Sequence, residues 1–396
     1  MSPPPRRHYG LDWLRIAAFV LLIVYHIGLM LSPWDWHVNG EEPVEWIVYV
    51  LVAMNPWRMM LLFIVSGYAT RAVLARAPSI RAFVRSRSAR LLLPLIFGVC
   101  FVVVPQPWIE LRQKLGYAQG LGHFWLHDYF GFGPRDYHTL GLFHLWFVAY
   151  IWVYCLVVAI AAALLPEGAQ RKAQRWFERA LSGWRLVVVP VAWLLIVRFL
   201  LMPGASPTNH VATDLPGHLI YLPAFLFGFG LARAEGMWPD ILRQWRPALA
   251  MMIVGYALLL WRMAGNPGMD WLKPMHQAEL GPASLMGWGA ILLLLGGAER
   301  WWNRDHRWRA TLTEAVFPVY LVHQTLIVTI GWWLIRHNLG AGVEFLILIL
   351  GTAAGCWAFY EAGRRIGWLR PLIGLSRRQA RPAGVERPAP PARSTT

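Results

Sequence analysis

Three ionisable residues share one face of the first hydrophobic segment of the chain, residues 11–32. At about 100° per residue, the steps from Arg15 to His26 return to within about 20° of the same direction. Asp12 lies one turn before Arg15, and about 16 Å of helix axis separates Arg15 from His26. Ionisable groups inside a bilayer are costly and usually face a cavity or a partner. The pattern predicts a site in which His26 is a general base or nucleophile and Asp12 is the counter-ion of Arg15.

Other polar residues in apolar segments are candidates for the same site. His144 and Trp146 begin one segment, where His144 could orient an acceptor and Trp146 could stack on a sugar ring. Tyr320 and His323 lie within another, and a second deep histidine favours a polar cavity. Each of these residues could instead have a purely structural role. A buried histidine, His26 included, can form a hydrogen bond to a neighbouring helix, and Trp is common at membrane interfaces.

Arginines form two groups with different expected roles. Arg87 and Arg90 are three residues apart, so they share a helix face at the edge of an apolar segment. Two guanidinium forks suit a phosphate-rich ligand, although anionic lipid headgroups would suit them as well. Arg58, Arg198 and Arg262 lie near the other ends of their segments. We expect these three to extend along the helix towards the interface rather than to bind an anion.

The composition indicates a membrane protein. Of 396 residues, 57% are hydrophobic and only 15% are charged, whereas a soluble protein carries about 25% charged residues. We expect an all-α polytopic fold in a single domain over residues 1–375, followed by a disordered, basic and Pro-rich tail over residues 376–396. About ten transmembrane helices are predicted, at residues 11–32, 57–75, 90–108, 141–165, 186–203, 216–233, 247–264, 282–298, 313–335 and 342–362.

Charge is distributed unevenly between alternate loops. With both termini cytoplasmic, 28 Lys and Arg residues fall on the inner side and 5 on the outer side, as the positive-inside rule requires. The net charge of +16 is therefore a topology signal, and we expect no nucleic-acid partner. The three cysteines fall within predicted helices and suggest neither a structural disulfide nor a metal site. No cleavable signal peptide is apparent, because the first apolar segment is too long and contains charged residues.

Several of these pieces occur in an order that resembles the membrane-bound acyltransferase 3 family. The resemblance covers residues 7–362 and rests on five motifs: Leu11-Asp12-Trp13-Leu14-Arg15 followed by His26, Leu62-Phe63-Ile64-Val65-Ser66-Gly67-Tyr68, Arg87-Ser88-Ala89-Arg90, His144-Leu145-Trp146-Phe147 and Tyr320-Leu321-Val322-His323. The run Trp34-Asp35-Trp36-His37 looks most like the glucan biosynthesis protein C branch, whose members succinylate periplasmic glucans.

This resemblance implies an enzyme of the bacterial cytoplasmic (inner) membrane. It would transfer an acetyl or succinyl group from cytoplasmic acyl-CoA, a co-substrate rather than a bound cofactor, to a hydroxyl of an extracytoplasmic glycan. His26 would be catalytic, Arg15 would fix the donor or support the site electrostatically, and Arg87 and Arg90 would bind the donor's phosphates. The other candidate substrate-binding residues are Asp12, His144, Trp146, Tyr320 and His323.

The sequence leaves two questions open, the chemical role of His26 and whether the protein is an enzyme or a transporter. His26 could deprotonate the acceptor for direct attack, or it could carry the acyl group itself. A transporter or flippase of a glycan or lipid-linked sugar would also explain the helices and the buried polar residues, without any acyl chemistry.

Overall fold

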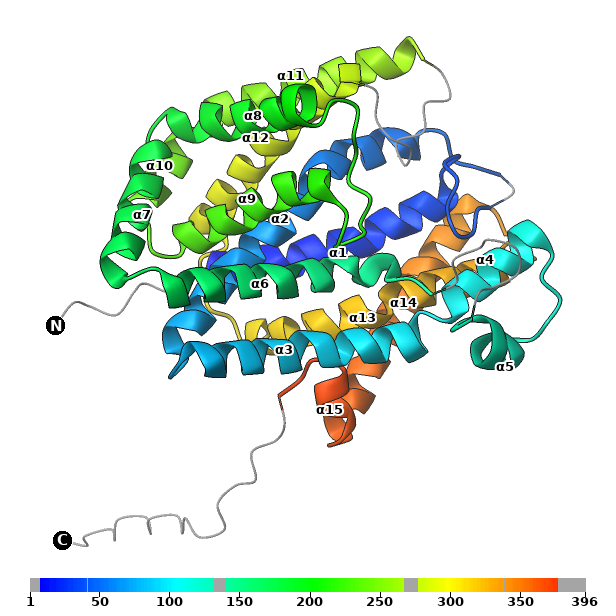
Figure 1. The fold of residues 1–396 in the computed structure, drawn as a ribbon. Coiled ribbons are helices and arrows are strands. Elements are labelled where there is room, and N and C mark those ends of the chain that lie inside the picture. The colour runs from blue at the N-terminus through cyan, green and yellow to red at the C-terminus, as the bar shows by residue number, and fades with distance from the viewer. Residues whose placement is uncertain (1–7, 41, 132–139, 267–276, 338, 377–396) are drawn as a thin grey trace, which may run out of the picture.

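The structure is a computed structural model that describes residues 8–40, 42–131, 140–266, 277–337 and 339–376. Within these ranges the chain forms helices and no strands (Figure 1). Of the predicted tail, only Ser376 lies inside the described residues. The helices are α1 (Tyr9–Leu31), α2 (Ile47–Arg76), α3 (Ile80–Phe97) with η1 (Gly98–Val102), α4 (Pro105–Leu115), α5 (Leu121–His123) with η2 (Phe124–Asp128), η3 (Phe143–Leu145), α6 (Trp146–Leu164), α7 (Glu167–Ala180), α8 (Arg185–Ile196) with η4 (Val197–Leu201), α9 (Leu215–Leu231), α10 (Met237–Arg243), α11 (Trp245–Ala264), α12 (Gln277–Trp301), α13 (Arg309–Leu334), α14 (Ala341–Arg365) and α15 (Leu369–Leu372).

The predicted all-α polytopic fold is confirmed. In the described part of the chain, eight helices are long and apolar enough to cross a membrane. The pair α7 and α8–η4 passes the same test together but is bent by 99°, and α9 is a shorter apolar helix of 17 residues. Each of the ten predicted segments coincides with a helix. Two of these helices, α8–η4 and α9, do not meet the criteria for a membrane span on their own, which is why eight are counted instead of ten.

Two helices begin ten residues earlier than expected. α2 begins at Ile47 rather than at residue 57, because Pro56 lies inside the helix instead of before it. Proline is tolerated within transmembrane helices where neighbouring groups satisfy the freed backbone. α3 begins at Ile80 rather than at residue 90. Its first turns carry arginines, so their hydropathy is too low for a membrane span to be predicted there.

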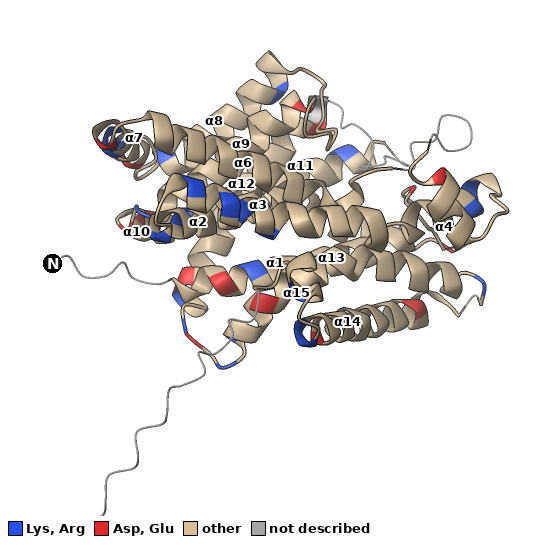
Figure 2. Ribbon diagram, turned by 60° about the horizontal axis from the view of Figure 1, so that its bottom comes forward, with Lys and Arg blue, Asp and Glu red and all other residues tan. Residues whose placement is uncertain are grey.

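Positive charge gathers at one end of the bundle, where α1 begins, α2 ends and α3 begins. Figure 2 shows Lys and Arg there on α2, α3, α7 and α10, and we call this the basic end. Arg370 lies 3.8 Å from Glu314, near the start of α13, so the described chain also finishes at this end. That the basic end faces the cytoplasm remains a prediction from its charge.

Helices α2 and α9 approach each other through two glycines. A Cβ atom on Gly67 would lie 1.9 Å from the carbonyl oxygen of Phe225, and one on Gly228 would lie 1.8 Å from that of Ile64. Small residues allow transmembrane backbones to pack this closely. The glycine of the Ser-Gly motif in α2 is therefore a packing residue, and this contact forms one wall of the bundle interior.

A larger side chain at Gly67 should separate α2 from α9. We expect Gly67→Val to lower the free energy of unfolding by about 1–3 kcal/mol, because backbone rather than a flexible side chain stands in the way. Thermal unfolding of the purified protein in detergent measures this as a lower Tm. Gly168→Ala on α7 is the control, since nothing lies within 4 Å of its added Cβ. An unchanged Tm for Gly67→Val would contradict the packing role.

Candidate active site

A cavity of about 430 Å³ lies inside the bundle, and we call it the central cavity. It is lined by residues of α1, α2, α6, α9 and α13, with further contributions from η3, η4, α12 and the segment before α9. Four predicted site residues meet there although they come from three separate parts of the sequence: His26, His144, Trp146 and Tyr320. The structure thus joins four of the nine predicted site residues around one space, while Asp12 and Arg15 line a different cavity.

His26 is paired with the second deep histidine of the sequence. Nδ1 of His26 lies 3.2 Å from Nε2 of His323, whose side chain is fully buried. Nδ1 of His323 is 2.7 Å from the carbonyl oxygen of Tyr320 and must donate to it. A neutral His323 then has only a lone pair on Nε2, so Nδ1 of His26 is the donor between the rings. This leaves a lone pair on Nε2 of His26, the nitrogen suited to accept a proton.

His144 and Tyr320 connect α13 to the start of α6. Nε2 of His144 lies 3.3 Å from the carbonyl oxygen of Leu321, and the hydroxyl of Tyr320 donates to the carbonyl oxygen of His144. Because Nε2 bonds to a carbonyl, it carries the proton of a neutral His144. Nδ1 is then an acceptor, and it is buried with no partner among the described residues.

The segment between α1 and α2 covers His26 on its other side. The ring of Trp36 stacks on that of His26, with centroids 5.9 Å apart and planes 18° from parallel. Next to it, Nε2 of His37 accepts a hydrogen bond of 3.0 Å from Gln324, which also lines the central cavity. The sequence placed Trp36 and His37 only in a family-like motif, and nothing in their spacing predicted a contact with His26.

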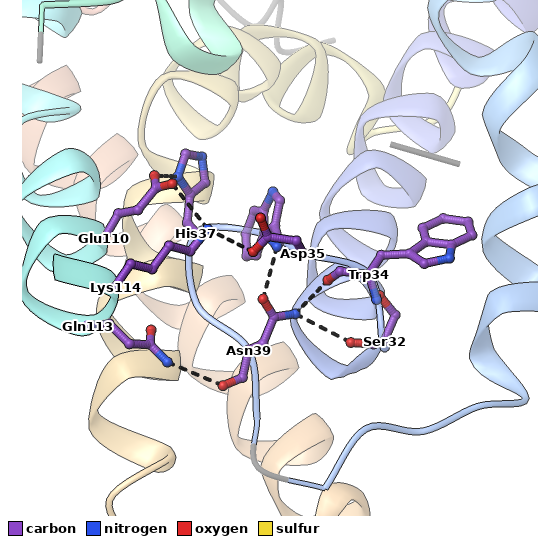
Figure 3. A network of polar contacts seen from close by, with 9 residues as sticks. Ser32, Trp34, Asp35, His37, Asn39, Glu110, Gln113 and Lys114 are labelled. Carbon is purple, nitrogen blue, oxygen red and sulfur yellow. Dashed lines mark hydrogen bonds and ion pairs between the residues drawn. The ribbon is translucent and has the colours of Figure 1, made fainter. Parts of the chain in front are cut away.

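Helix α4 holds this segment in place (Figure 3). Glu110 accepts from Nδ1 of His37 at 2.5 Å, and Lys114 forms an ion pair of 2.8 Å with Asp35. Asn39 closes the turn internally, with Nδ2 donating to the carbonyl oxygen of Trp34 at 2.7 Å. Since Glu110 and Lys114 are four residues apart, they lie on one face of α4. These contacts fix the position of Trp36 against His26.

A second and larger cavity of about 1130 Å³ opens at the basic end. Arg15 lines it together with Arg71, Arg76 and Arg233. Nε of Arg15 is buried and has no hydrogen-bond partner in the described part of the chain. In the sequence, Arg71, Arg76 and Arg233 counted only as charges on the inner side of the membrane. Their clustering could not be predicted, because it depends on the ends of α2 and α9 lying side by side.

Asp12 is close enough for its charge to act on Arg15, as the sequence suggested, but its ion pair is with a residue of α13. Its carboxylate accepts from Nη1 of Arg309 at 2.8 Å, across from the start of α13. Arg87 and Arg90 of α3 are close enough for their charges to act on Arg15. Nε of Arg87 is also buried without a partner among the described residues. The cavity at the basic end is lined by four arginines and by four carboxylates, Asp12, Glu178, Glu235 and Asp240, and Arg87 and Arg90 add two further guanidinium groups near Arg15.

Two of the three arginines expected at the interface instead face the central cavity. Arg58 and Arg198 both line it, and each has a buried Nε without a partner in the described ranges. Arg262 lies 3.4 Å from Glu279, whose side chain is buried. The prediction was wrong for Arg58 and Arg198, since position along a helix gives the depth of a residue but not the direction of its side chain.

The described residues contain no group of three His, Cys, Asp or Glu that could hold a metal ion. Cys100, Cys155 and Cys356 are free thiols.

This arrangement defines a polytopic membrane protein with a polar cavity inside its bundle and a basic cavity at one end. A family described as an acyltransferase domain matches residues 8–361, so the chain belongs to the acyltransferase 3 family and is an enzyme that transfers acyl groups.

Curated relatives match almost the whole chain. The proteins named glucans biosynthesis protein C from Escherichia coli O6:K15:H31 and from Shigella boydii serotype 4 are each 24% identical to it over 384 residues. The match covers 94% of this chain and 96% of each relative. No solved structure matches it.

Proposed function

We propose that this protein transfers an acetyl or succinyl group from acyl-CoA to a hydroxyl of a glucan outside the cytoplasm, in the bacterial inner membrane. The glucan acceptor is suggested by the name of its relatives. The observation that carries the proposal is the pairing of His26 with His323, which leaves an unprotonated nitrogen of His26 beside the central cavity.

His26 would act as the base of the reaction. Its Nε2 takes the proton from the acceptor hydroxyl as that oxygen attacks the thioester carbonyl, and it then returns the proton to the departing thiolate. Transfer through an acyl-histidine would use the same lone pair. Trp146 and Tyr221, whose rings lie 5.7 Å apart at the cavity wall, offer aromatic surfaces for a sugar ring.

The donor would bind at the basic end. Its phosphates would meet Arg71, Arg76 and Arg233, which line the larger cavity. Arg87 and Arg90, which the sequence suggested for this role, are not among the described residues that line it. Arg15 lines the same cavity from α1. From Arg15 the donor's arm must extend about 16 Å along α1 to reach His26. Phe19 lies between them and packs against Tyr320 with ring centroids 5.4 Å apart, so its ring lies on the route.

The test uses the full chain in lipid nanodiscs, with acetyl-CoA and succinyl-CoA offered separately and free thiol measured over time. We expect thiol release to depend on an added periplasmic glucan and the glucan to gain the mass of the acyl group. Glucan translocation without thiol release from either donor would instead support a transporter and would overturn the proposal.

Removing charge from the basic-end cavity should weaken donor binding alone. For the double variant Arg71→Gln with Arg233→Gln, we expect the KM for acyl-CoA to rise about tenfold or more and kcat to change little. Each guanidinium–phosphate hydrogen bond contributes about 1.5–3 kcal/mol. High salt should reproduce part of the effect in the wild type. Arg171→Gln on α7, exposed and paired with Glu167, is the control. A lower kcat at unchanged KM would contradict the assignment.

A further inference from the structure

Arg58 carries a charge inside the bundle that no described residue neutralises. It lines the central cavity, and both Nε and Nη1 are buried without a hydrogen-bond partner among the described residues. A guanidinium keeps its charge in a protein, so its burial without an anion is costly. Within a membrane-spanning segment, such a group usually faces a substrate path. A guanidinium at a cavity wall can donate to an oxygen of the substrate.

The position of Arg58 is fixed relative to His26. Its guanidinium carbon lies 3.3 Å from the centroid of the Tyr25 ring, a cation–π contact with a fully buried partner. The hydroxyl of Tyr25 donates to Oδ1 of Asn55 at 3.4 Å, which ties the ring back to α2. Tyr25 directly precedes His26, and the centroids of their rings are 5.9 Å apart. One ring therefore holds the guanidinium beside the imidazole.

Arg58 and Arg198 differ in what surrounds them, although both line the central cavity. The charge of Arg58 acts on His26 as well as on Tyr221. Arg198 is close enough to Tyr221 for its charge to act on that phenol. Arg58 is thus the arginine that lies beside the proposed base. Arg198 lies on the side of η4 and suits a charge at the far end of the substrate.

We propose that Arg58 is a catalytic residue that stabilises the oxyanion formed on the acyl carbonyl, an inference that rests on the function proposed above. When the acceptor oxygen bonds to the carbonyl carbon, His26 takes the hydroxyl proton and the carbonyl electron pair moves to oxygen. The guanidinium of Arg58, at the cavity wall, donates to that oxygen. Collapse of the intermediate restores the carbonyl, breaks the carbon–sulfur bond, and transfers the proton from His26 to the thiolate.

A different role would also place an arginine in this cavity, namely binding the free carboxylate of a succinyl group. The two roles are separated by the charge of the acyl group. An oxyanion forms with every thioester, so the loss of a residue that stabilises it slows acetyl and succinyl transfer alike. A carboxylate is present only on the succinyl donor, so loss of a carboxylate site spares acetyl transfer.

The experiment compares Arg58→Gln and Arg198→Gln with the wild type in nanodiscs, using acetyl-CoA and succinyl-CoA with the same glucan. For Arg58→Gln, we expect kcat to fall about 100-fold or more with both donors while the KM for each donor changes little. For Arg198→Gln, in the same cavity, we expect succinyl transfer to fall more than acetyl transfer. Arg171→Gln on α7, exposed and paired with Glu167, is the control and should leave both activities within about threefold of the wild type. Intrinsic Tyr and Trp fluorescence on heating reports whether each variant is folded.

The proposal is tested by comparing the loss of kcat with acetyl-CoA to the loss of kcat with succinyl-CoA. If Arg58→Gln loses only succinyl transfer, or keeps both activities, Arg58 does not stabilise the oxyanion and the inference is overturned. If Arg58→Gln does not fold, Arg58→Lys takes its place, and its loss of kcat is compared between the two donors in the same way. If the wild type itself releases no thiol from either donor, the proposed function fails first and this inference fails with it.

Discussion

Replacing His26 by alanine is expected to lower kcat for thiol release by about 10³-fold or more while leaving the binding of acyl-CoA within about threefold. A positioned general base contributes about 10²–10⁴-fold to a reaction, and His26 is the histidine of the central cavity whose tautomer is set by His323. Nδ1 of His144 has no hydrogen-bond partner among the described residues, but it is buried, and Nε2 of that residue bonds to α13. Donor binding should survive because the basic-end cavity is lined by other residues.

The measurement is kcat and KM for thiol release in nanodiscs, with donor binding measured separately by calorimetry. His337→Ala serves as the control, since His337 is an exposed histidine at the end of α13. Retention of more than a tenth of wild-type kcat by His26→Ala would show that the base lies elsewhere. Loss of donor binding together with turnover would instead indicate that His26 supports the structure of the bundle.

The helices and part of the site could be predicted from the sequence because both depend on local pattern. Apolar length gave the spans, and helical periodicity placed Arg15 and His26 on one face. The same reasoning could identify His323 as a deep polar residue. It could not pair His323 with His26, since that contact depends on how α1 and α13 pack side by side.

The errors arose where the direction of a side chain or a long-range contact decides the outcome. Arg58 and Arg198 have the depth of interfacial residues, yet their helices turn them towards the central cavity. The charge of Asp12 acts on Arg15 one helical turn away, yet Asp12 also forms an ion pair with Arg309 across the bundle, which the sequence did not indicate. Trp36 reaches His26 only because α4, far along the chain, holds its segment. None of these long-range contacts has a signal in local sequence.

A leucine in place of His323 is expected to reduce kcat by about 100-fold while both KM values stay near those of the wild type. His323 touches neither acceptor nor donor in the proposed mechanism, but its Nε2 fixes the proton of His26 on Nδ1. Without that acceptor, the imidazole can rotate and present the wrong nitrogen to the cavity. Loss of the tautomer-fixing partner of a catalytic histidine is known to cost up to about 10⁴-fold in other enzymes.

Rescue separates this positioning role from a simple loss of packing. His323→Gln keeps an amide oxygen that can accept from Nδ1 of His26, so it should recover to within about tenfold of the wild-type kcat. His323→Leu fills similar space without an acceptor, and it should remain inactive even where its Tm equals that of His323→Gln. If both variants lose the same activity at equal Tm, accepting the proton of His26 is not what His323 contributes. Recovery in the glutamine variant alone would trace the reactivity of His26 to a hydrogen bond that begins at the backbone carbonyl of Tyr320.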